Sequence, residues 1–380
     1  MKYYIIAGEP SGDLHASNLI RALKLEDPDA DIRCWGGELS EQAGGHLVRH
    51  YRDLALMGFI EIVASLGVIL KALKFCKKDI AAWQPDVVIL VDYAGFNMRI
   101  ARWAKENGFR TFYYIAPKVW AWNTGRVHKL KKYVDKLFSI LPFEPEFFAK
   151  YDYKVDYVGN PVNDAVHKFR LNPNFRTEND LNDLPIIAVL PGSRKQEIEH
   201  MLHFMVSIFP GFITRYQFVI AAVPHFPQKY YESFRRHPNI KVVYSQTYDL
   251  LANAHAAVVT SGTATLETAM FEVPQVVCYR GSTISYAIAR AVVRVKYISL
   301  PNLIANEGFL KELIQDNFNP NNLITELTKV AEDDNVRAEQ GRQYQKIKSL
   351  LGHPGASETT ARLMVKYLRE WGVDKSEPKD

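Results

Sequence analysis

The chain has 380 residues, more than one ordinary hydrophobic core accommodates, so two domains are expected. It is 47% hydrophobic and 23% charged, a balance that excludes a disordered chain. The net charge of +5 does not require a nucleic-acid partner, although it suits an anionic surface or a phosphorylated ligand. Three widely spaced cysteines match neither a disulfide framework nor a zinc site, which indicates a reducing compartment.

Short apolar runs alternate with amphipathic stretches along most of the chain. The first run is too short for a signal peptide, and no run of about 18 uncharged apolar residues predicts a membrane-spanning helix. Strands that alternate with helices favour a parallel sheet covered by helices on both faces. Strands are expected at 3–7, 86–91, 111–115, 136–141, 186–190, 217–222, 240–244, 256–260 and 275–279, with helices between them, for example at 13–25 and 96–107.

A polar stretch at 168–185, rich in Asn, Asp and Pro, is typical of a linker. The expected fold class is therefore α/β, with two doubly wound parallel-sheet (Rossmann-like) domains that leave a cleft between them. The expected layout is an N-terminal domain at 1–168 and a C-terminal domain at 185–350. A helix at 351–372 is expected to pack on the N-terminal domain or on a partner chain, followed by a polar tail at 373–380.

A loop of small residues, Gly8-Glu9-Pro10-Ser11-Gly12-Asp13, follows the first expected strand. Small residues let the backbone approach a ligand, and the next helix offers unpaired N–H groups and a partial positive charge. The spacing is neither a dinucleotide fingerprint nor a P-loop. The loop is a candidate ligand loop, or an ordinary tight turn in which Ser11 or Asp13 caps the helix.

Asp92 lies where a buried parallel strand is expected to end, at the edge where α/β enzymes keep their chemistry. A carboxylate there can act as a general base. Alternatively, Asp92 or Asn97 only caps the next helix.

Trp120 and Trp122 follow the next strand. They line a lipid or sugar pocket, or they pack in the core, which is the commoner position for Trp.

Two turns in the second half repeat the pattern of a strand end followed by a helix. The first ends in Arg194, whose guanidinium beside a helix N-terminus would suit a diphosphate. In the second, Ser261, Gly262 and Thr263 can bind phosphate through N–H and hydroxyl groups, and Glu267 can reach ribose hydroxyls. The alternatives are a solvated arginine and a Ser/Thr cap with Glu267 as its capping-box partner. Both turns in one domain favour a nucleotide site.

Residues 57–75 are too apolar for a helix with one buried stripe, and four lysines lie between 71 and 78. Such a helix can lie on an anionic bilayer, with Val68, Ile69 and Leu73 as contacts. The alternative is a helix buried between the sheet and a partner helix. The scattered histidines show no ligand pairing, so no metal site is expected.

Taken in this order, the motifs resemble the lipid-A-disaccharide synthase family over roughly residues 3–368. One motif alone is weak, but the ordered series is specific. The resemblance rests on the 8–13 loop, Leu56-Met57-Gly58, Asp92 with Phe96-Asn97, Val119-Trp120-Ala121-Trp122, Leu141-Pro142-Phe143-Glu144, residues 190–194, residues 261–267 and Ser299-Leu300-Pro301-Asn302-Leu303.

Three positions depart from the pattern of this family. Ala94-Gly95 stands where the family usually has Pro-Asp, which leaves Asp92 as the only acid in its loop. Lys118 stands where the family usually has Ser, and Asn160 where it often has His. The last two departures concern details of acceptor binding rather than the reaction.

The resemblance implies a GT-B-type inverting glycosyltransferase of lipid A (lipopolysaccharide) biosynthesis. It would join UDP-2,3-diacylglucosamine, the donor, to 2,3-diacylglucosamine 1-phosphate, the acceptor, giving a disaccharide 1-phosphate and UDP. Asp92 would be the base, which takes a proton from the acceptor 6-hydroxyl, or would position that base. The acceptor side would include Gly8, Glu9, Ser11, Gly12, Asp13, Asn97, Trp120 and Trp122; the donor side Arg194, Ser261, Gly262, Thr263, Glu267 and Asn302.

The resemblance also implies a cytoplasmic enzyme that is peripheral on the inner face of the inner membrane, and a homodimer. No cofactor or metal would be needed if Arg194 and the helix N-termini hold the diphosphate. Two other classes stay open at this point. One is another GT-B UDP-sugar enzyme, with a different acceptor or an epimerase activity, and the other is a non-catalytic nucleotide-binding relative.

Overall fold

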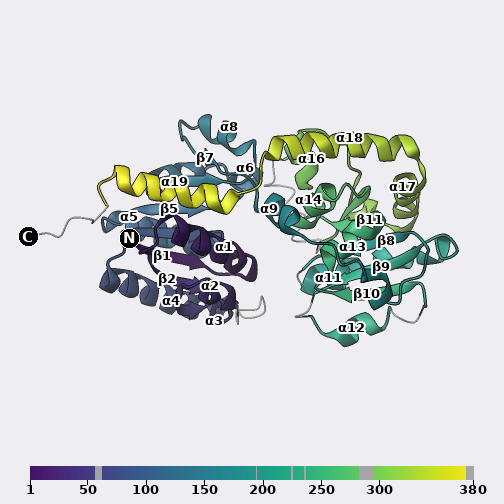
Figure 1. Ribbon diagram of the computed structural model, residues 1–380, viewed down its shortest axis with the longest axis horizontal. Helices are drawn as coiled ribbons and strands as arrows, with labels where there is room; N and C mark the ends of the chain where they lie inside the picture. The colour runs from purple at the N-terminus through teal and green to yellow at the C-terminus, as the bar shows by residue number, and fades with distance from the viewer. Residues whose placement is uncertain (56–61, 194, 224–225, 235–236, 282–294, 374–380) are drawn as a thin grey trace, which may run out of the picture. The chain divides into compact units, whose positions relative to one another are not determined.

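The computed structural model describes residues 1–55, 62–193, 195–223, 226–234, 237–281 and 295–373. The chain divides into two compact units (Figure 1). Unit 1 comprises Met1–Pro161 and the chain from His353 onward, and unit 2 comprises Val162–Gly352. No helix among the described residues is long and apolar enough to cross a membrane.

Unit 1 is built on a sheet of seven parallel strands in the order β3-β2-β1-β4-β5-β6-β7. Because the order runs outward in both directions from β1 and β4, the sheet is doubly wound, with its switch point between these two strands. The strands are β1 (Lys2–Ala7), β2 (Asp31–Gly36), β3 (His46–His50), β4 (Val87–Val91), β5 (Thr111–Tyr114), β6 (Lys136–Ser139) and β7 (Asp156–Tyr157).

Helices cover both faces of this sheet because the buried strands are apolar on both sides. In β1, Tyr4 and Ile6 pack beneath α4, α5 and α7, whereas Tyr3 and Ile5 pack beneath α1 and α19. The helix expected at 351–372 is α19, and it packs on α1 of its own unit (Figure 1). The helices are α1 (Pro10–Glu26), α2 (Glu38–Gln42), α3 (Arg52–Ala55), α4 (Ile62–Trp83), α5 (Ala94–Glu106), α6 (Val119–Trp122), α7 (Arg126–Tyr133), α8 (Glu144–Ala149) and α19 (Ala356–Glu370).

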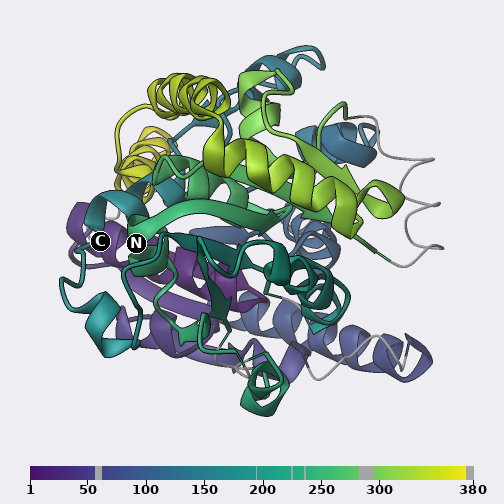
Figure 2. The same ribbon diagram turned by 90° about the vertical axis from the view of Figure 1, so that its right-hand side faces the viewer.

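Unit 2 repeats this architecture with six parallel strands in the order β10-β9-β8-β11-β12-β13 and a switch point between β8 and β11. Figure 2 shows helices on both sides of its strands. The strands are β8 (Ile186–Leu190), β9 (Gln217–Ala222), β10 (Ile240–Tyr244), β11 (Ala254–Thr260), β12 (Gln275–Tyr279) and β13 (Glu312–Ile314). The helices are α9 (Pro161–Lys168), α10 (Phe175–Glu178), α11 (Lys195–Ser207), η1 (Phe209–Gly211), α12 (Gln228–Glu232), α13 (Thr247–Asn253), α14 (Thr263–Met270), α16 (Leu300–Ala305), η2 (Gln315–Asn317), α17 (Pro320–Glu332) and α18 (Asp334–Leu351).

The expected fold class, two doubly wound α/β parallel sheets, is confirmed. The expected linker at 168–185 is wrong, because this stretch packs on unit 2. Phe175 is buried in the core that also holds Leu250 and Val259, and Leu181 packs against that core. The backbone N–H of Asn172 donates to Asp249. The chain therefore passes from unit 1 to unit 2 at Pro161.

Four strands, β2, β3, β7 and β13, were not expected from the apolar runs. β2 contains the charged residues Asp31 and Arg33, and only part of it is buried. β3 lies at the edge of its sheet and has no fully buried residue, while β7 and β13 have only two and three residues. Such strands form because a neighbouring strand supplies their hydrogen bonds, which a local apolar pattern does not reveal.

Candidate functional site

The loops singled out from the sequence follow the strands that flank the two switch points. In unit 1, Ala7 and Val91 are register partners at the carboxyl ends of β1 and β4, so the 8–13 loop lies beside Asp92. In unit 2, Leu190 pairs with Val259, so the turn after β8 lies beside the turn after β11. Ligands of open α/β sheets bind in the crevice at this place. Each unit thus brings two candidate loops together.

In the first loop, Gly8 is buried under the ring of Tyr93. A methyl group at Gly8 would lie 2.5 Å from Cγ and 2.6 Å from Cε1 of that ring, so only glycine fits. Glu9 and Ser11 are exposed, and α1 begins at Pro10 between them. Glu9 and Ser11 therefore lie exposed beside the switch point, and their contact with a ligand stays a prediction.

Asp13 has a different role from the expected ligand contact. Its side chain is buried and accepts hydrogen bonds from the backbone N–H groups of Gly37 (2.7 Å), Leu39 (3.2 Å) and Ser40 (3.1 Å). These are the unpaired groups at the start of α2, which Asp13 caps from another part of the chain. Asp13 therefore links the 8–13 loop to the start of α2. Gly12 is also buried, against Ala7.

Asp92 lies half-buried at the end of β4, where it begins a turn of uncommon backbone conformation. Asp92 and Tyr93 both have φ of 47°. The turn is held because the carbonyl oxygen of Asp92 accepts hydrogen bonds from Tyr113 Oη (2.6 Å) and Asn97 Nδ2 (2.8 Å). Non-glycine residues in the left-handed region cluster at functional sites. Asp92 thus lies at the carboxyl end of a buried parallel strand, as expected, and its role as a base stays a prediction.

Asn97 was expected to line the acceptor site, but its side chain is fully buried. Its side-chain amide donates to the carbonyl oxygens of Ile6 (3.3 Å), Val91 (3.2 Å) and Asp92. It therefore ties the ends of β1 and β4 together and fixes the turn that carries Asp92. Its role is support rather than ligand contact.

Trp120 packs in the core, so the structural alternative is correct for this residue. It is 8% exposed, and its indole N–H donates to Glu144 Oε1 at 3.0 Å. Glu144 Oε2 also accepts from the backbone N–H groups of Ile140 (3.2 Å) and Leu141 (3.1 Å). Glu144 thus joins the loop after β5 to the loop after β6. The side chain of Trp122 lies outside the described residues.

Burial raises the pKa of Glu144 to about 7. The folded protein therefore keeps a proton that the unfolded chain releases near pH 4.5. We expect the free energy of unfolding to fall as pH rises from about 4.5 to about 7. Urea titrations should show this slope in the wild type and a flatter one in Glu144→Gln.

Glu146→Gln is the matched control, because Glu146 is exposed on the same helix. It should keep the wild-type slope. The assignment fails if Glu144→Gln and Glu146→Gln give the same dependence of stability on pH.

In unit 2, the turn after β11 presents small residues at the start of α14. Gly262 precedes the helix, and Thr263, its first residue, is exposed. Ser261 Oγ donates to the carbonyl oxygen of Ile298 at 2.9 Å, which holds the turn against a neighbouring loop. The first-turn N–H groups of a helix attract phosphate. After β8, Gly192 adopts φ of +100°, and Arg194 lies outside the described residues.

Glu267 and Asn302 are held by other side chains. Tyr248 Oη donates to Glu267 Oε1 at 2.9 Å, and burial raises the pKa of Glu267. Asn302 is fully buried, and its amide donates to Leu310 O (3.0 Å) and Glu312 Oε1 (2.9 Å). Asn302 was expected to contact the donor substrate. This prediction is wrong, because both hydrogens of its side-chain amide are donated to groups within the protein.

Tyr113, Tyr248 and Glu312 were not expected among the residues that hold these loops. Glu312 accepts hydrogen bonds from Ile298, Ser299 and Asn302 and so fixes the segment that contacts Ser261. The residues around them in the sequence form no motif that could have predicted this role. Their partners are distant in the chain, so only the fold reveals the contacts.

α4 contains the described part of the expected membrane segment 57–75, and its side chains divide between core and surface. Leu73 is 6% exposed and packs with the unit 1 core, so it is not a membrane contact, and Ile69 packs partly against that core. Val68 and Leu70 are 42% and 58% exposed. Residues 56–61 lie outside the described residues, as do the side chains of 62–66.

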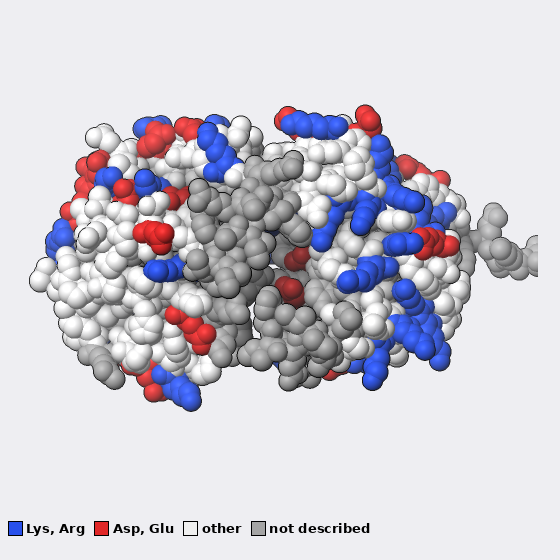
Figure 3. All heavy atoms as spheres, turned by 180° about the vertical axis from the view of Figure 1, so that it is seen from behind, with Lys and Arg blue, Asp and Glu red and all other residues white. Residues whose placement is uncertain are grey.

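Basic side chains gather on the face formed by α4, α5 and α7, which pack side by side. The three helices hold eleven Lys and Arg residues but only two acidic ones, Asp79 and Glu106. Both acids are already paired, with Arg33 and Arg102. Figure 3 shows Lys and Arg gathered on unit 1, at the right of the view. We call this surface the basic face.

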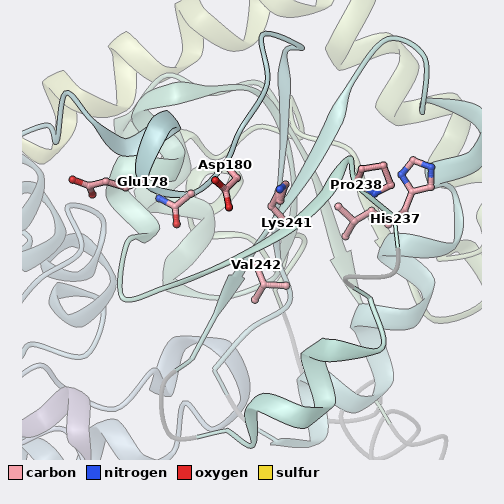
Figure 4. A pocket seen from close by; sticks show the side chains of 8 residues that line it. Glu178, Asp180, His237, Pro238, Lys241 and Val242 are labelled. Carbon is pink, nitrogen blue, oxygen red and sulfur yellow. The ribbon is translucent and has the colours of Figure 1, made fainter.

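The pocket in Figure 4 lies elsewhere. It measures about 340 Å³. Its lining residues come from the end of α10 and the turn after it, and from β10 and the residues just before it. They include Glu178, Asp180, His237 and Lys241. A second pocket of about 410 Å³ lies between Lys105 and Trp371. None of the site residues expected from the sequence lines either pocket. Within the described ranges, no cluster of three or more His, Cys, Asp or Glu could hold a metal ion.

The lipid-A-disaccharide synthetase family profile matches residues 3–364. The chain belongs to the lipid-A-disaccharide synthase family. A relative from Syntrophus aciditrophicus (strain SB), named lipid-A-disaccharide synthase, is 34% identical over 373 residues, 96% of this chain and 97% of the relative. A relative of the same name from Geobacter metallireducens is 33% identical over 380 residues and covers 96% of each chain. Membership gives this chain the glycosyltransferase role that forms the lipid A disaccharide in lipid A biosynthesis.

Solved structures share the fold at low sequence identity. UDP-GlcNAc 2-epimerase from Methanocaldococcus jannaschii, in complex with UDP-GlcNAc and UDP, has a TM-score of 0.64 and 15% identity. The match covers 96% of this chain and 100% of the epimerase. A glycotransferase of kitacinnamycin has a TM-score of 0.61 and 12% identity, covering 96% and 98%. The architecture is thus GT-B-type, and the family, not these neighbours, decides the activity.

Proposed function

We propose that this chain joins UDP-2,3-diacylglucosamine to 2,3-diacylglucosamine 1-phosphate with inversion at the anomeric carbon. The family match over residues 3–364 carries this proposal. The purified chain, given both substrates, should release UDP and form the disaccharide 1-phosphate, which mass spectrometry identifies. An epimerase would instead interconvert the UDP-sugar without acceptor. A non-catalytic relative would bind UDP and release none from the donor.

The proposed chemistry assigns different steps to the two units. Asp92 takes the proton from the acceptor 6-hydroxyl, and the oxygen forms a bond to C1 of the donor as the C1–O bond to UDP breaks. The departing diphosphate gains negative charge, which Arg194 and the N–H groups at the start of α14 stabilise. Ser261 and Thr263 add hydroxyl donors, and Glu267 contacts the ribose. Glu9 and Ser11 hold the acceptor beside Asp92.

The proposal includes no metal ion or cofactor. An arginine fork and helix N-termini can replace a divalent cation on a diphosphate, because both present oriented donors with positive charge. Turnover in EDTA should equal turnover in added Mg²⁺. A dependence on the metal would require a different account of UDP departure.

We further propose that unit 1 lies on the inner face of the inner membrane, in the cytoplasm. The acylated substrates are insoluble as monomers, so the enzyme takes them from a bilayer or micelle. The basic face would meet anionic headgroups, each lysine contributing on the order of 1 kcal/mol near a charged leaflet. The exposed Val68 and Leu70 would enter the apolar region. A homodimer is also part of the proposal, and sedimentation velocity tests it.

Leu70 and Leu73 allow a matched test of this surface, because they lie one turn apart on α4 with opposite exposure. Val68→Ser with Leu70→Ser should weaken binding to liposomes that contain anionic lipid and leave the melting temperature within about 2 °C. Leu73→Ser should lower the free energy of unfolding by about 2–5 kcal/mol, because it removes a buried side chain.

Salt separates the two parts of the membrane interaction. Salt screens the attraction of the lysines but not apolar insertion, so wild-type liposome binding should weaken yet persist as salt rises. In the double Ser variant, high salt should abolish the binding that remains. Unchanged liposome binding by a folded double variant would contradict the membrane role of α4.

A further inference from the structure

Tyr93 lies at the switch point of unit 1, with its ring over Gly8. It follows Asp92 directly, and its left-handed backbone, with φ of 47° and ψ of 51°, turns the side chain back over the end of β1. There the ring leaves no room for a side chain at Gly8. The ring also packs 5.8 Å from that of Phe96. One aromatic side chain thus joins the two loops to which we assign the acceptor.

A sugar ligand explains the geometry of Tyr93 better than a purely structural role does. A filler side chain needs no strained backbone, whereas here two successive non-glycine residues are left-handed and are held so by Tyr113 and Asn97. Tyr93 packs against the unit 1 core but is only partly buried. Burial and the charge of Glu9 raise the pKa of the Tyr93 hydroxyl, so it stays a neutral donor.

From this arrangement we propose that Tyr93 binds the acceptor sugar, with its ring against the sugar face and its hydroxyl hydrogen-bonded to a sugar oxygen. Aromatic rings are common in ligand sites because they combine a flat apolar face with a polar edge. The contact would hold the 6-hydroxyl beside Asp92, so Tyr93 is a specificity residue next to the base. The inference rests on the proposed acceptor.

Three substitutions separate the parts of this contact. Tyr93→Phe removes the hydroxyl and should reduce kcat/KM for the acceptor about 2- to 10-fold. Tyr93→Leu keeps apolar bulk but removes the flat ring and should reduce it about tenfold or more. The KM for the donor and the affinity for UDP should not change. Tyr151→Leu is the matched control, because Tyr151 is also half-buried in unit 1 but follows α8, before β7.

A test without activity checks the ring position. Gly8→Ala should lower the melting temperature, because the new methyl group meets the Tyr93 ring. Adding Tyr93→Ala to Gly8→Ala should restore part of that loss, because the ring is gone. If Gly8→Ala is as stable as the wild type, the ring does not lie where the inference requires it.

Direct binding separates this inference from the proposed function. Calorimetry with a short-chain 2,3-diacylglucosamine 1-phosphate, without donor, should show weaker binding to Tyr93→Leu than to the wild type and Tyr151→Leu. If the wild type binds this acceptor but forms no disaccharide, the proposed reaction fails and weaker binding by Tyr93→Leu still supports the contact. Equal binding by a folded Tyr93→Leu, or no binding by the wild type, overturns the inference.

Discussion

Asp92→Asn should lower turnover by about 10²–10⁴-fold while the protein stays folded and binds UDP normally. Asn has the shape of Asp but cannot accept the proton of the acceptor hydroxyl. It also tolerates the left-handed backbone at this position, where φ is 47°. The hydrogen bonds from Tyr113 and Asn97 reach the carbonyl oxygen of residue 92, so these two bonds remain in the variant. The loss should therefore appear in kcat with little change in melting temperature.

Asp152→Asn is the matched control for this experiment. Asp152 is an exposed residue of the same unit with φ of 51°, so the substitution repeats the backbone context away from the crevice. It should leave both turnover and stability unchanged. Turnover of Asp92→Asn within a few-fold of the wild type would show that another group accepts the proton.

Arg194→Ala should weaken UDP binding by about 10- to 100-fold, because it removes charge-assisted hydrogen bonds to the diphosphate. In the sequence, the residue comes two positions after Gly192, whose φ is +100°, and directly before α11. Arg194→Lys keeps the charge but not the planar fork, so its affinity should be intermediate. The loss should be smaller with UMP, which lacks the second phosphate. Isothermal titration calorimetry measures both ligands.

Glu267→Ala should weaken UDP binding less than Arg194→Ala does. Glu267 would contact only the ribose, and its side chain is already hydrogen-bonded to Tyr248. Arg342→Ala is a control for loss of an exposed arginine of unit 2, where Arg342 pairs with Glu339 on α18. Equal effects of Arg194→Ala and Arg342→Ala would contradict the donor site, as would a larger effect of Glu267→Ala.

In both sheets, the strands that are continuous apolar runs could be predicted from the sequence alone. The strand Ile186–Leu190 has the expected bounds, because a strand buried on both faces is apolar at every position. The loops at the switch points were also found, because small residues and a lone carboxylate after such a run are local features. The ordered motifs were enough to indicate the family, which the profile match confirms.

Tertiary structure decided which of these residues are buried and hydrogen-bonded within the protein. Asp13 and Asn302 carry the right chemistry, but their partners, the start of α2 and Glu312, come from other elements and use up their hydrogen-bonding groups. The rotation of α4 against the sheet buries Leu73 and exposes Leu70, although both are leucines in one apolar run. Burial depends on what packs against a residue, and that neighbour is supplied by the fold rather than by the local sequence.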